Sequence, residues 1–170
     1  MSEITADDLT ERFDLLQSEP EKYLALCNEY VRQHPSDSHG YFSRHQVWER
    51  LGRSDMAIRD LNGSLDIEEH PATLCARGIL LGKAGQYGEA IKDFNRLEEL
   101  DPKGFAPCGA ALFRANCHAR LGNEEAALAD CALLPDDHWT PNLFGAPGGT
   151  KAEIAARLRE IVEEARQSQG

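Results

Sequence analysis

The stretch PATLCARGILLGKAGQYGEAIKDFNRLEELDPKG, residues 71–104, decides how the rest of the chain is interpreted. Its apolar and small residues recur three or four positions apart, first around Gly78 and then around Phe94, which is the spacing of two amphipathic helices. Gly85 separates these helices, and Pro102 ends the second one because proline cannot continue a helix. The stretch therefore predicts a helix, a tight turn and a second helix.

Six residues of this stretch carry a resemblance to a known repeat family. They are Gly78, Gly85, Tyr87, Ala90, Phe94 and Pro102. Each stands where the tetratricopeptide repeat (TPR) family has a signature residue, so the stretch resembles one repeat of that family. The resemblance implies an all-α fold, a right-handed α-superhelix of antiparallel helix pairs with a C-terminal capping helix. It also implies a class of function, the binding of other proteins.

Weaker copies of the pattern lie on both sides of this repeat. The turn glycines Gly52, Gly85 and Gly122 are 33 and 37 residues apart, close to the family period of about 34 residues. We therefore expect six segments along the chain. They are a degenerate N-terminal helix pair at 1–37, repeats at 38–70, 71–104 and 105–134 (the last one truncated), a Pro/Gly-rich loop at 135–149, and a capping helix at 150–170.

Three helix starts carry the capping-box pattern, in which a hydroxyl side chain precedes an acidic residue by three positions. The pairs are Thr5 with Asp8, Ser18 with Glu21, and Thr150 with Glu153. The first of these predicts a helix whose apolar stripe contains Leu9, Phe13 and Leu16.

The 135–149 loop contains three large apolar residues, Trp139, Leu143 and Phe144. A solvated linker does not need so many, so we expect the loop to pack onto the third repeat. In the alternative, the loop folds into the binding groove and mimics a ligand.

An arginine and an aspartate recur together, sixteen residues apart, in the three clearer repeats. The pairs are Arg44 with Asp60, Arg77 with Asp93, and Arg114 with Asp130. Antiparallel helices joined by a tight turn bring such positions together, which predicts a partly buried ion pair in each repeat. In the alternative, the three arginines stay unpaired and form a ladder that grips an acidic ligand.

The resemblance implies that the first helices of successive repeats line a concave groove. The predicted groove residues are Phe42, Gln46, Cys75, Ile79, Leu112 and Asn116. The apolar members would receive side chains of an extended peptide, and the two amides would bind its main chain. In the alternative, these positions only complete the packing between repeats.

Arg50, Lys83 and Arg120 end the three first helices at equivalent positions. They form a candidate basic rim for an acidic segment or a terminal carboxylate. Cations in the last turn of a helix also stabilise its dipole without any ligand, by about 0.3–1 kcal/mol each.

The composition restricts the partner and the compartment. With 29 acidic and 18 basic side chains the formal net charge is −11, which disfavours a nucleic-acid ligand and favours a basic or neutral one, although the acidity also serves solubility. No apolar run approaches the roughly 20 residues of a membrane span, and the N-terminus has no secretory pattern. Five cysteines without a C-x-x-C pair fit buried thiols in a reducing compartment. We therefore expect a cytoplasmic protein.

Nothing in the sequence favours catalysis. The six histidines have no metal-ligand spacing, and GAPGG at 145–149 lacks the pattern of a phosphate-binding loop. We expect no catalytic residue, metal or cofactor. The predicted function is a non-catalytic interaction module that binds a protein or peptide in its groove. A homo-oligomer that buries its groove or end faces is the alternative, and a metal protein or enzyme is the third candidate.

Overall fold

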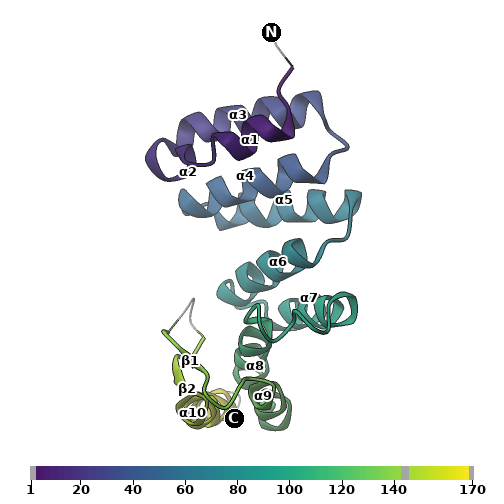
Figure 1. Cartoon of the computed structure of the whole chain (residues 1–170). Coiled ribbons are helices and arrows are strands. Elements are labelled where there is room, and N and C mark those ends of the chain that lie inside the picture. The colour runs from purple at the N-terminus through teal and green to yellow at the C-terminus, as the bar shows by residue number, and fades with distance from the viewer. Residues whose placement is uncertain (1–2, 143–145, 169–170) are drawn as a thin grey trace. The chain divides into compact units, whose positions relative to one another are not determined.

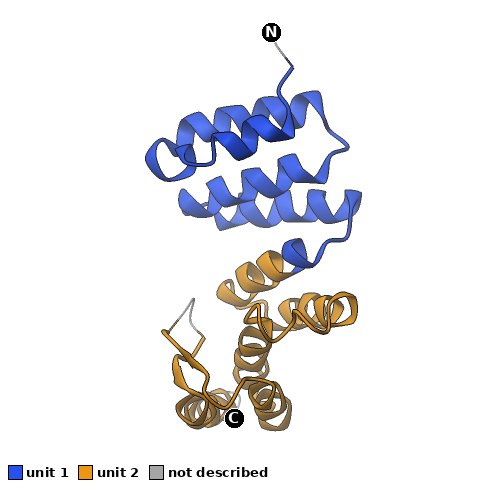
Figure 2. Ribbon diagram, in the orientation of Figure 1, with its two compact units in different colours: residues 1–74 blue, residues 75–170 orange. Residues whose placement is uncertain are grey.

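The structure is a computed structural model that describes residues 3–142 and 146–168, which form ten helices and one two-stranded sheet (Figure 1). It divides into two compact units, residues 1–74 and residues 75–170 (Figure 2). We call them unit 1 and unit 2. Helix α6 (Pro71–Lys83) begins in unit 1 and continues in unit 2.

Unit 1 is built from short helices that pack as neighbours. They are α1 (Ala6–Glu11), α2 (Leu15–Ser18), α3 (Pro20–Gln33), α4 (Ser38–Arg50) and α5 (Ser54–Ile67). Helix α4 packs against α3 on one side and α5 on the other, while α1 and α2 both lie against α3 and α4. The apolar core contains Leu9, Leu16, Tyr23, Cys27, Tyr30 and Val47.

The N-terminal segment differs from its prediction. Helix α1 ends at Glu11, and turn hydrogen bonds such as Phe13 N–H to Thr10 O (3.3 Å) separate it from α2. The break changes the helical phase, so Phe13 leaves the predicted stripe and is 45% exposed, while Leu9 and Leu16 stay buried. The Thr5 capping box is confirmed.

The predicted capping box at Ser18 is wrong. The Ser18 hydroxyl donates to the Asp14 carbonyl instead (3.2 Å), and the N-cap of α3 is Glu19, with Pro20 as the first helical residue. Proline is accepted there because the first turn of a helix needs no donor from it.

Unit 2 contains the rest of α6 and the C-terminal elements. They are α7 (Tyr87–Leu100), α8 (Ala110–Arg120), α9 (Glu124–Ala132), β1 (Trp139–Thr140), β2 (Gly149–Thr150) and α10 (Lys151–Gln167). Helix α8 packs against α7 and α9, and α10 covers α8 and α9 with a stripe of Ile154, Leu158, Ile161 and Val162. The helix predicted to cap this end of the chain therefore completes the core of unit 2.

The turn glycines adopt the backbone conformation that their position requires. Gly52, Gly85 and Gly122 have φ angles of 71°, 76° and 77°, in the left-handed region that side chains with a Cβ atom avoid. Gly78 has another role, because a Cβ atom there would lie 2.9 Å from the Phe94 ring. Its lack of a side chain lets α6 and α7 approach closely.

The 135–149 loop forms a short antiparallel pairing of β1 with β2, with Trp139 opposite Thr150. Trp139 is 68% exposed, so the expectation that it packs onto the third repeat is wrong for this residue. Leu143 and Phe144 lie outside the described residues. Ala146 is fully buried in the core of unit 2, and the capping box at Thr150 is confirmed.

Candidate functional site

Each of the three repeated arginines donates two parallel hydrogen bonds to the aspartate of its own repeat. From Nε and Nη2 the distances are 2.8 and 2.7 Å for Arg44–Asp60, 2.8 and 2.6 Å for Arg77–Asp93, and 2.9 and 2.6 Å for Arg114–Asp130. All three carboxylates are at most 5% exposed. Such paired, largely buried guanidinium groups do not form a ladder open to an acidic ligand.

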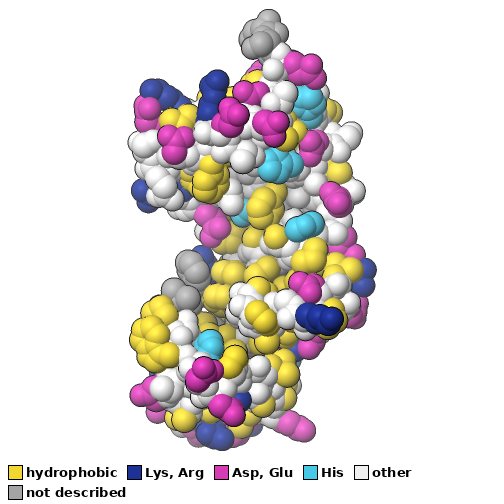
Figure 3. All heavy atoms as spheres, in the orientation of Figure 1, with side chains coloured by type: hydrophobic (Ala, Val, Ile, Leu, Met, Phe, Trp, Pro, Cys, Tyr) yellow, Lys and Arg dark blue, Asp and Glu magenta, His cyan; other side chains and the backbone are white. Residues whose placement is uncertain are grey.

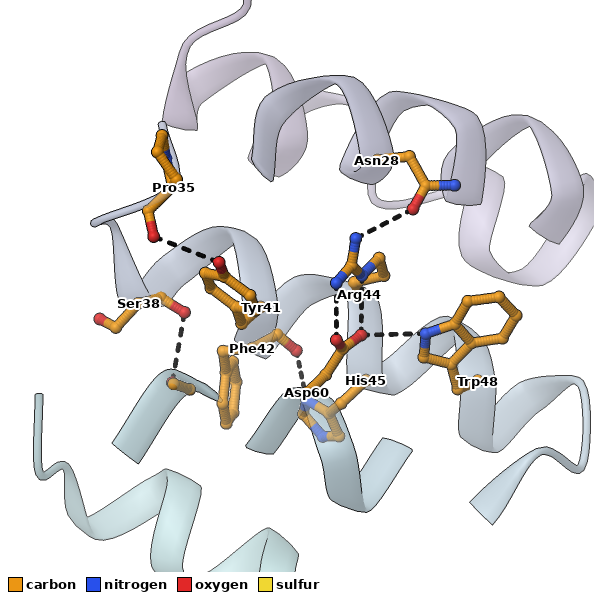
Figure 4. A network of polar contacts seen from close by, with 10 residues as sticks. Asn28, Pro35, Ser38, Tyr41, Phe42, Arg44, His45, Trp48 and Asp60 are labelled. Atoms are coloured by element: carbon orange, nitrogen blue, oxygen red, sulfur yellow. Dashed lines mark hydrogen bonds and ion pairs between the residues drawn. The ribbon is translucent and has the colours of Figure 1, made fainter. Parts of the chain in front are cut away.

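Arg44 and Arg114 also reach the helix before their own repeat. Arg44 Nη1 donates to Asn28 Oδ1 on α3 (3.0 Å, Figure 4), and Arg114 Nη1 donates to Asn95 Oδ1 on α7 (2.8 Å). The same Arg114 atom contacts Glu98 at 2.6 Å. Arg44 and Arg114 therefore join successive helix pairs within their units, a role that we did not predict.

Two adjoining cavities open in unit 1, beside α4. The first, of about 300 Å³, is lined by Leu9, Thr10, Phe13, Tyr23, His39, Phe42, Ser43 and Gln46. The second, of about 390 Å³, is lined by Asp37, Ser38, His39, Phe42, Ser64, Glu68, His70, Ala72 and Thr73. Both cavities share His39 and Phe42. In Figure 3, hydrophobic and histidine side chains gather in neighbouring patches on the visible face of unit 1.

Buried neighbours hold Phe42 in place between the cavities. Its ring packs against the His45 ring with the centroids 4.6 Å apart, and its carbonyl accepts a hydrogen bond from His45 Nδ1 (Figure 4). His45 is 3% exposed, and burial lowers its pKa, against the opposing effects of the Phe42 carbonyl and Glu49. A neutral His45 with its proton on Nδ1 satisfies this contact, which fixes the position of Phe42 on α4.

The start of α4 is fixed by a second set of contacts. Asp37 caps the helix by accepting the backbone N–H of His39 at 2.9 Å, and it also accepts the hydroxyl of Tyr30. Burial and the Asp37 carboxylate raise the Tyr30 pKa to about 12, so the phenol stays protonated and donates. These contacts position His39 at the wall between the two cavities.

His39 presents a polar atom without a partner. Its Nε2 atom is buried and makes no hydrogen bond to any described residue. Buried polar atoms are normally hydrogen-bonded, so this atom is an exception among the buried polar groups of unit 1. The first cavity also has a firm wall, because Tyr23 donates to the Leu9 carbonyl (3.0 Å) and packs edge-to-face with Phe13 at 6.1 Å.

In unit 2 the predicted groove residues are divided between the core and the half-buried surface. Leu112 is 4% exposed and belongs to the core beneath α10, so its packing removes it from the ligand-accessible surface. Cys75, Ile79 and Asn116 are half-buried. The Asn116 Oδ1 atom is buried without a hydrogen-bond partner among the described residues, which leaves an acceptor for an added group.

The predicted basic-rim residues Arg50, Lys83 and Arg120 are all exposed and lie in the last turns of α4, α6 and α8. Arg120 lines a cavity of about 430 Å³ in unit 2 together with Asn142, Pro147, Gly148, Arg157 and Ile161. Arg157 is already paired with Glu160 at 2.6 Å. Of the predicted basic-rim residues, Arg120 therefore lies at a cavity.

Within the described ranges, no group of three or more histidine, cysteine, aspartate or glutamate side chains could hold a metal ion. None of the helices that the structure describes has both the length and the apolar character of a membrane span.

Comparison with known proteins identifies the fold. No protein-family model matches the chain, and no curated protein matches it. The crystal structure of YrrB, described as a TPR protein with an unusual peptide-binding site, is similar with a TM-score of 0.69 at 18% identity, over 96% of this chain and 92% of YrrB. A tetratricopeptide repeat protein from Parabacteroides merdae is similar with a TM-score of 0.55 at 20% identity, over 96% of this chain and 58% of that one. These likenesses confirm a TPR-like, all-α helical-repeat fold.

Proposed function

We propose that this TPR-like chain is a non-catalytic interaction module, and that the two adjoining cavities of unit 1 bind an extended peptide segment. The pair of cavities that share His39 and Phe42 is the observation that carries the proposal. Alternate side chains of an extended peptide point the same way and lie about 7 Å apart, so neighbouring cavities suit two of them. YrrB, of the same fold, is itself described as having a peptide-binding site.

The cavity linings suggest which peptide fits. Leu9, Phe13, Tyr23 and Phe42 give the first cavity an apolar and aromatic lining, which suits a large apolar side chain. Asp37 and Glu68 give the second cavity an acidic lining. Unit 1 carries 15 acidic and 7 basic side chains, a net charge of −8, so its field favours a basic segment. The proposed ligand pairs an apolar anchor with a basic residue.

A polar contact would fix the peptide main chain. Gln46 lines the first cavity, and its amide can bond a main-chain group. Such a bond gives orientation rather than most of the affinity.

The test is selection from a random peptide library with the full-length chain, followed by affinity measurement on the enriched peptides. Phe42→Glu places a charge between the cavities, and Ala25→Glu adds the same charge at an exposed position of α3 that lines neither cavity. We expect apolar–basic peptides to be enriched, Phe42→Glu to weaken them about tenfold or more, and Ala25→Glu to leave affinity unchanged. No enrichment, or equal binding by Phe42→Glu with circular dichroism unchanged, would refute the proposal.

Self-association is the second candidate function, and exposed apolar side chains of unit 2 favour it. Leu121 and Leu133 are each 47% exposed and Trp139 is 68% exposed, so these side chains are available to pack against a second copy of the chain. Light scattering on eluting protein separates the two functions. A dimer that persists on dilution and is lost in Trp139→Ser supports assembly, whereas a monomer at all concentrations argues against it.

A further inference from the structure

Cys75 and Cys108 meet in unit 2 although 33 residues separate them in the sequence. Cys75 lies in the second turn of α6, and Cys108 stands two residues before Ala110, the first residue of α8. The two thiols are in hydrogen-bonding contact. Cys108 is exposed and Cys75 is half-buried, so a small molecule from solvent reaches Cys108 first, with Cys75 as its neighbour.

We propose that Cys75 and Cys108 form an oxidation site, at which a peroxide converts the thiol pair to an intramolecular disulfide. The pair has the two parts that such a site requires, an accessible thiol and a second thiol in contact with it.

Local contacts position the Cys108 sulfur and favour its ionised form. When protonated, Cys108 donates to the Phe105 carbonyl, with Sγ and O 3.2 Å apart. When ionised, it accepts from the Cys75 thiol and from the backbone N–H of Ala110, and these contacts lower its pKa to about 6, although burial and Asp101 oppose them. Cys75 keeps its proton, because its contact with Cys108 and its own burial raise its pKa. These contacts therefore favour the thiolate form at Cys108 and the thiol form at Cys75.

The other three cysteines differ from this pair in burial and in pKa. Cys27, Cys117 and Cys131 are at most 2% exposed. Burial raises the pKa of Cys27 and of Cys117 to about 12, and it also raises that of Cys131. Burial keeps these thiols protonated and shielded, as we expected of most of the five cysteines, so we expect them to be oxidised last. The contact between Cys75 and Cys108 could not be foreseen, because they belong to different repeats.

The reaction balances with hydrogen peroxide as the two-electron oxidant. The Cys108 thiolate attacks one peroxide oxygen, the O–O bond breaks, and a sulfenic acid and hydroxide form. The Cys75 sulfur then attacks the sulfenic sulfur, the S–S bond forms and the S–O bond breaks. Cys75 loses its proton in this step and the leaving oxygen departs as water. One peroxide and two thiols give one disulfide and two waters.

The disulfide would link α6 to the segment that precedes α8. This segment contains Phe105, which is 1% exposed and packs under the Arg114 guanidinium, 4.4 Å from its carbon to the ring centroid. Cys75 is also a predicted groove residue, so oxidation would change that surface. Any effect on ligand affinity rests on the proposed peptide binding, whereas the formation of the disulfide does not.

Trypsin separates all five cysteines into different peptides, which makes the site directly measurable. Cys75 falls in residues 60–77, Cys108 in 104–114, Cys27 in 23–32, Cys117 in 115–120 and Cys131 in 121–151. The full chain is treated with a small molar excess of hydrogen peroxide at pH 7, its remaining thiols are alkylated, and the digest is analysed by mass spectrometry without reduction.

We expect a cross-linked pair of peptides 60–77 and 104–114, from monomeric protein, while the other three cysteines are recovered alkylated. Cross-links of other composition, or equal oxidation of all five cysteines in folded protein, would overturn the proposal. So would recovery of Cys108 as a free thiol under conditions that oxidise an unstructured cysteine peptide.

Two variants separate the roles of the pair. In Cys75→Ser the Cys108 sulfenic acid has no resolving partner, so we expect it to be trapped by dimedone. In Cys108→Ser we expect Cys75 to react at least tenfold more slowly than Cys108 does in the wild type. If Cys75 reacts as fast without Cys108, the assignment of Cys108 as the attacking thiol is refuted, and unchanged circular dichroism excludes unfolding as the reason.

Discussion

Units 1 and 2 place equivalent helix positions in opposite environments. Phe42 on α4 and Leu112 on α8 each precede the paired arginine of their repeat by two residues. Phe42 separates two open cavities, whereas Leu112 is 4% exposed beneath α10. The repeat pattern therefore sets where a residue lies on its helix, and the elements that cover the helix decide whether it lines an open cavity or fills the core.

The two units also differ in net charge. Unit 1 carries 15 acidic and 7 basic side chains, a net charge of −8, and unit 2 carries 14 and 11, a net charge of −3. The two cavities that share Phe42 thus belong to the more acidic unit. A basic ligand of unit 1 should lose affinity as salt screens this field.

The largest expected effect contrasts the arginine pairs of the two units. Arg114→Ala strands a buried Asp130 and should lower the free energy of unfolding by about 3–5 kcal/mol. Arg44→Ala should lower it by about 1.5–3 kcal/mol. The Arg44 side chain is more exposed, 19% against 9%, and Asp60 keeps its bond from Trp48 Nε1 at 2.9 Å. Urea unfolding followed by circular dichroism measures both, and a smaller loss for Arg114→Ala would break the comparison.

Truncation of the two equivalent apolar positions should separate core from surface. Leu112→Ala leaves a cavity in the core of unit 2 and should destabilise the chain by about 2–5 kcal/mol. Phe42→Ala should cost less than about 1 kcal/mol, because its ring lines open cavities, yet it should weaken peptide binding. Thermal unfolding and peptide affinity are measured on both variants. Equal losses of stability would show that Phe42 and Leu112 contribute equally to the packing of the chain.

Two buried glycines should show where the units are alike. A Cβ atom on Gly40 would lie 2.6 Å from the Tyr30 ring, and one on Gly78 would lie 2.9 Å from the Phe94 ring. Both rings are buried, so alanine at either position should destabilise by about 1–3 kcal/mol. Gly88→Ala on α7, where nothing lies within 4 Å, is the control and should stabilise by about 0.5–1 kcal/mol. Stabilisation by all three substitutions would contradict the close packing.

The smallest effect is expected at Trp139. Because its side chain is 68% exposed on β1, Trp139→Ala should change the free energy of unfolding by no more than about 0.5 kcal/mol. Thermal unfolding checks this, and the wild-type fluorescence should be readily quenched by acrylamide. A loss of several degrees in the melting temperature would restore the expectation that this residue packs onto the third repeat.

Local pattern predicted much of the architecture. Helical periodicity and the turn glycines specify the helix pairs of the better repeats, because both depend on residues close in sequence. The sixteen-residue spacing of arginine and aspartate likewise predicts contacts that the structure contains, since one turn fixes the geometry of both helices. These features need no knowledge of more distant segments.

The N-terminal segment shows where local pattern is insufficient. Leu9, Phe13 and Leu16 fit one helical stripe, but a turn after Glu11 changes the phase and turns Phe13 toward a cavity. No proline or glycine marks that turn in the sequence. Whether this segment forms one helix or two depends on how α1 and α2 pack against α3 and α4. The spacing of apolar residues gives no information about that packing.

The candidate site was only partly predictable for a related reason. Phe42 and Gln46, two of the predicted groove positions, line the first cavity of unit 1. His39 lies one turn before Phe42 on the same helix, whereas Phe13 joins them only because the segment around α1 packs against α4. Leu112 was misplaced because its burial depends on α10, forty residues further along the chain. Exposure is a property of the assembled unit rather than of the repeat.

The most direct test of the account is amide NMR of the 18.9 kDa chain during titration with a peptide enriched by library selection. The account predicts concentration-dependent shifts in residues 6–13 and 38–50, around the two cavities of unit 1, and small changes in residues 110–120 of α8. Shifts concentrated in α8 with α4 unaffected would contradict it, because the ligand would then bind away from the two cavities that share Phe42.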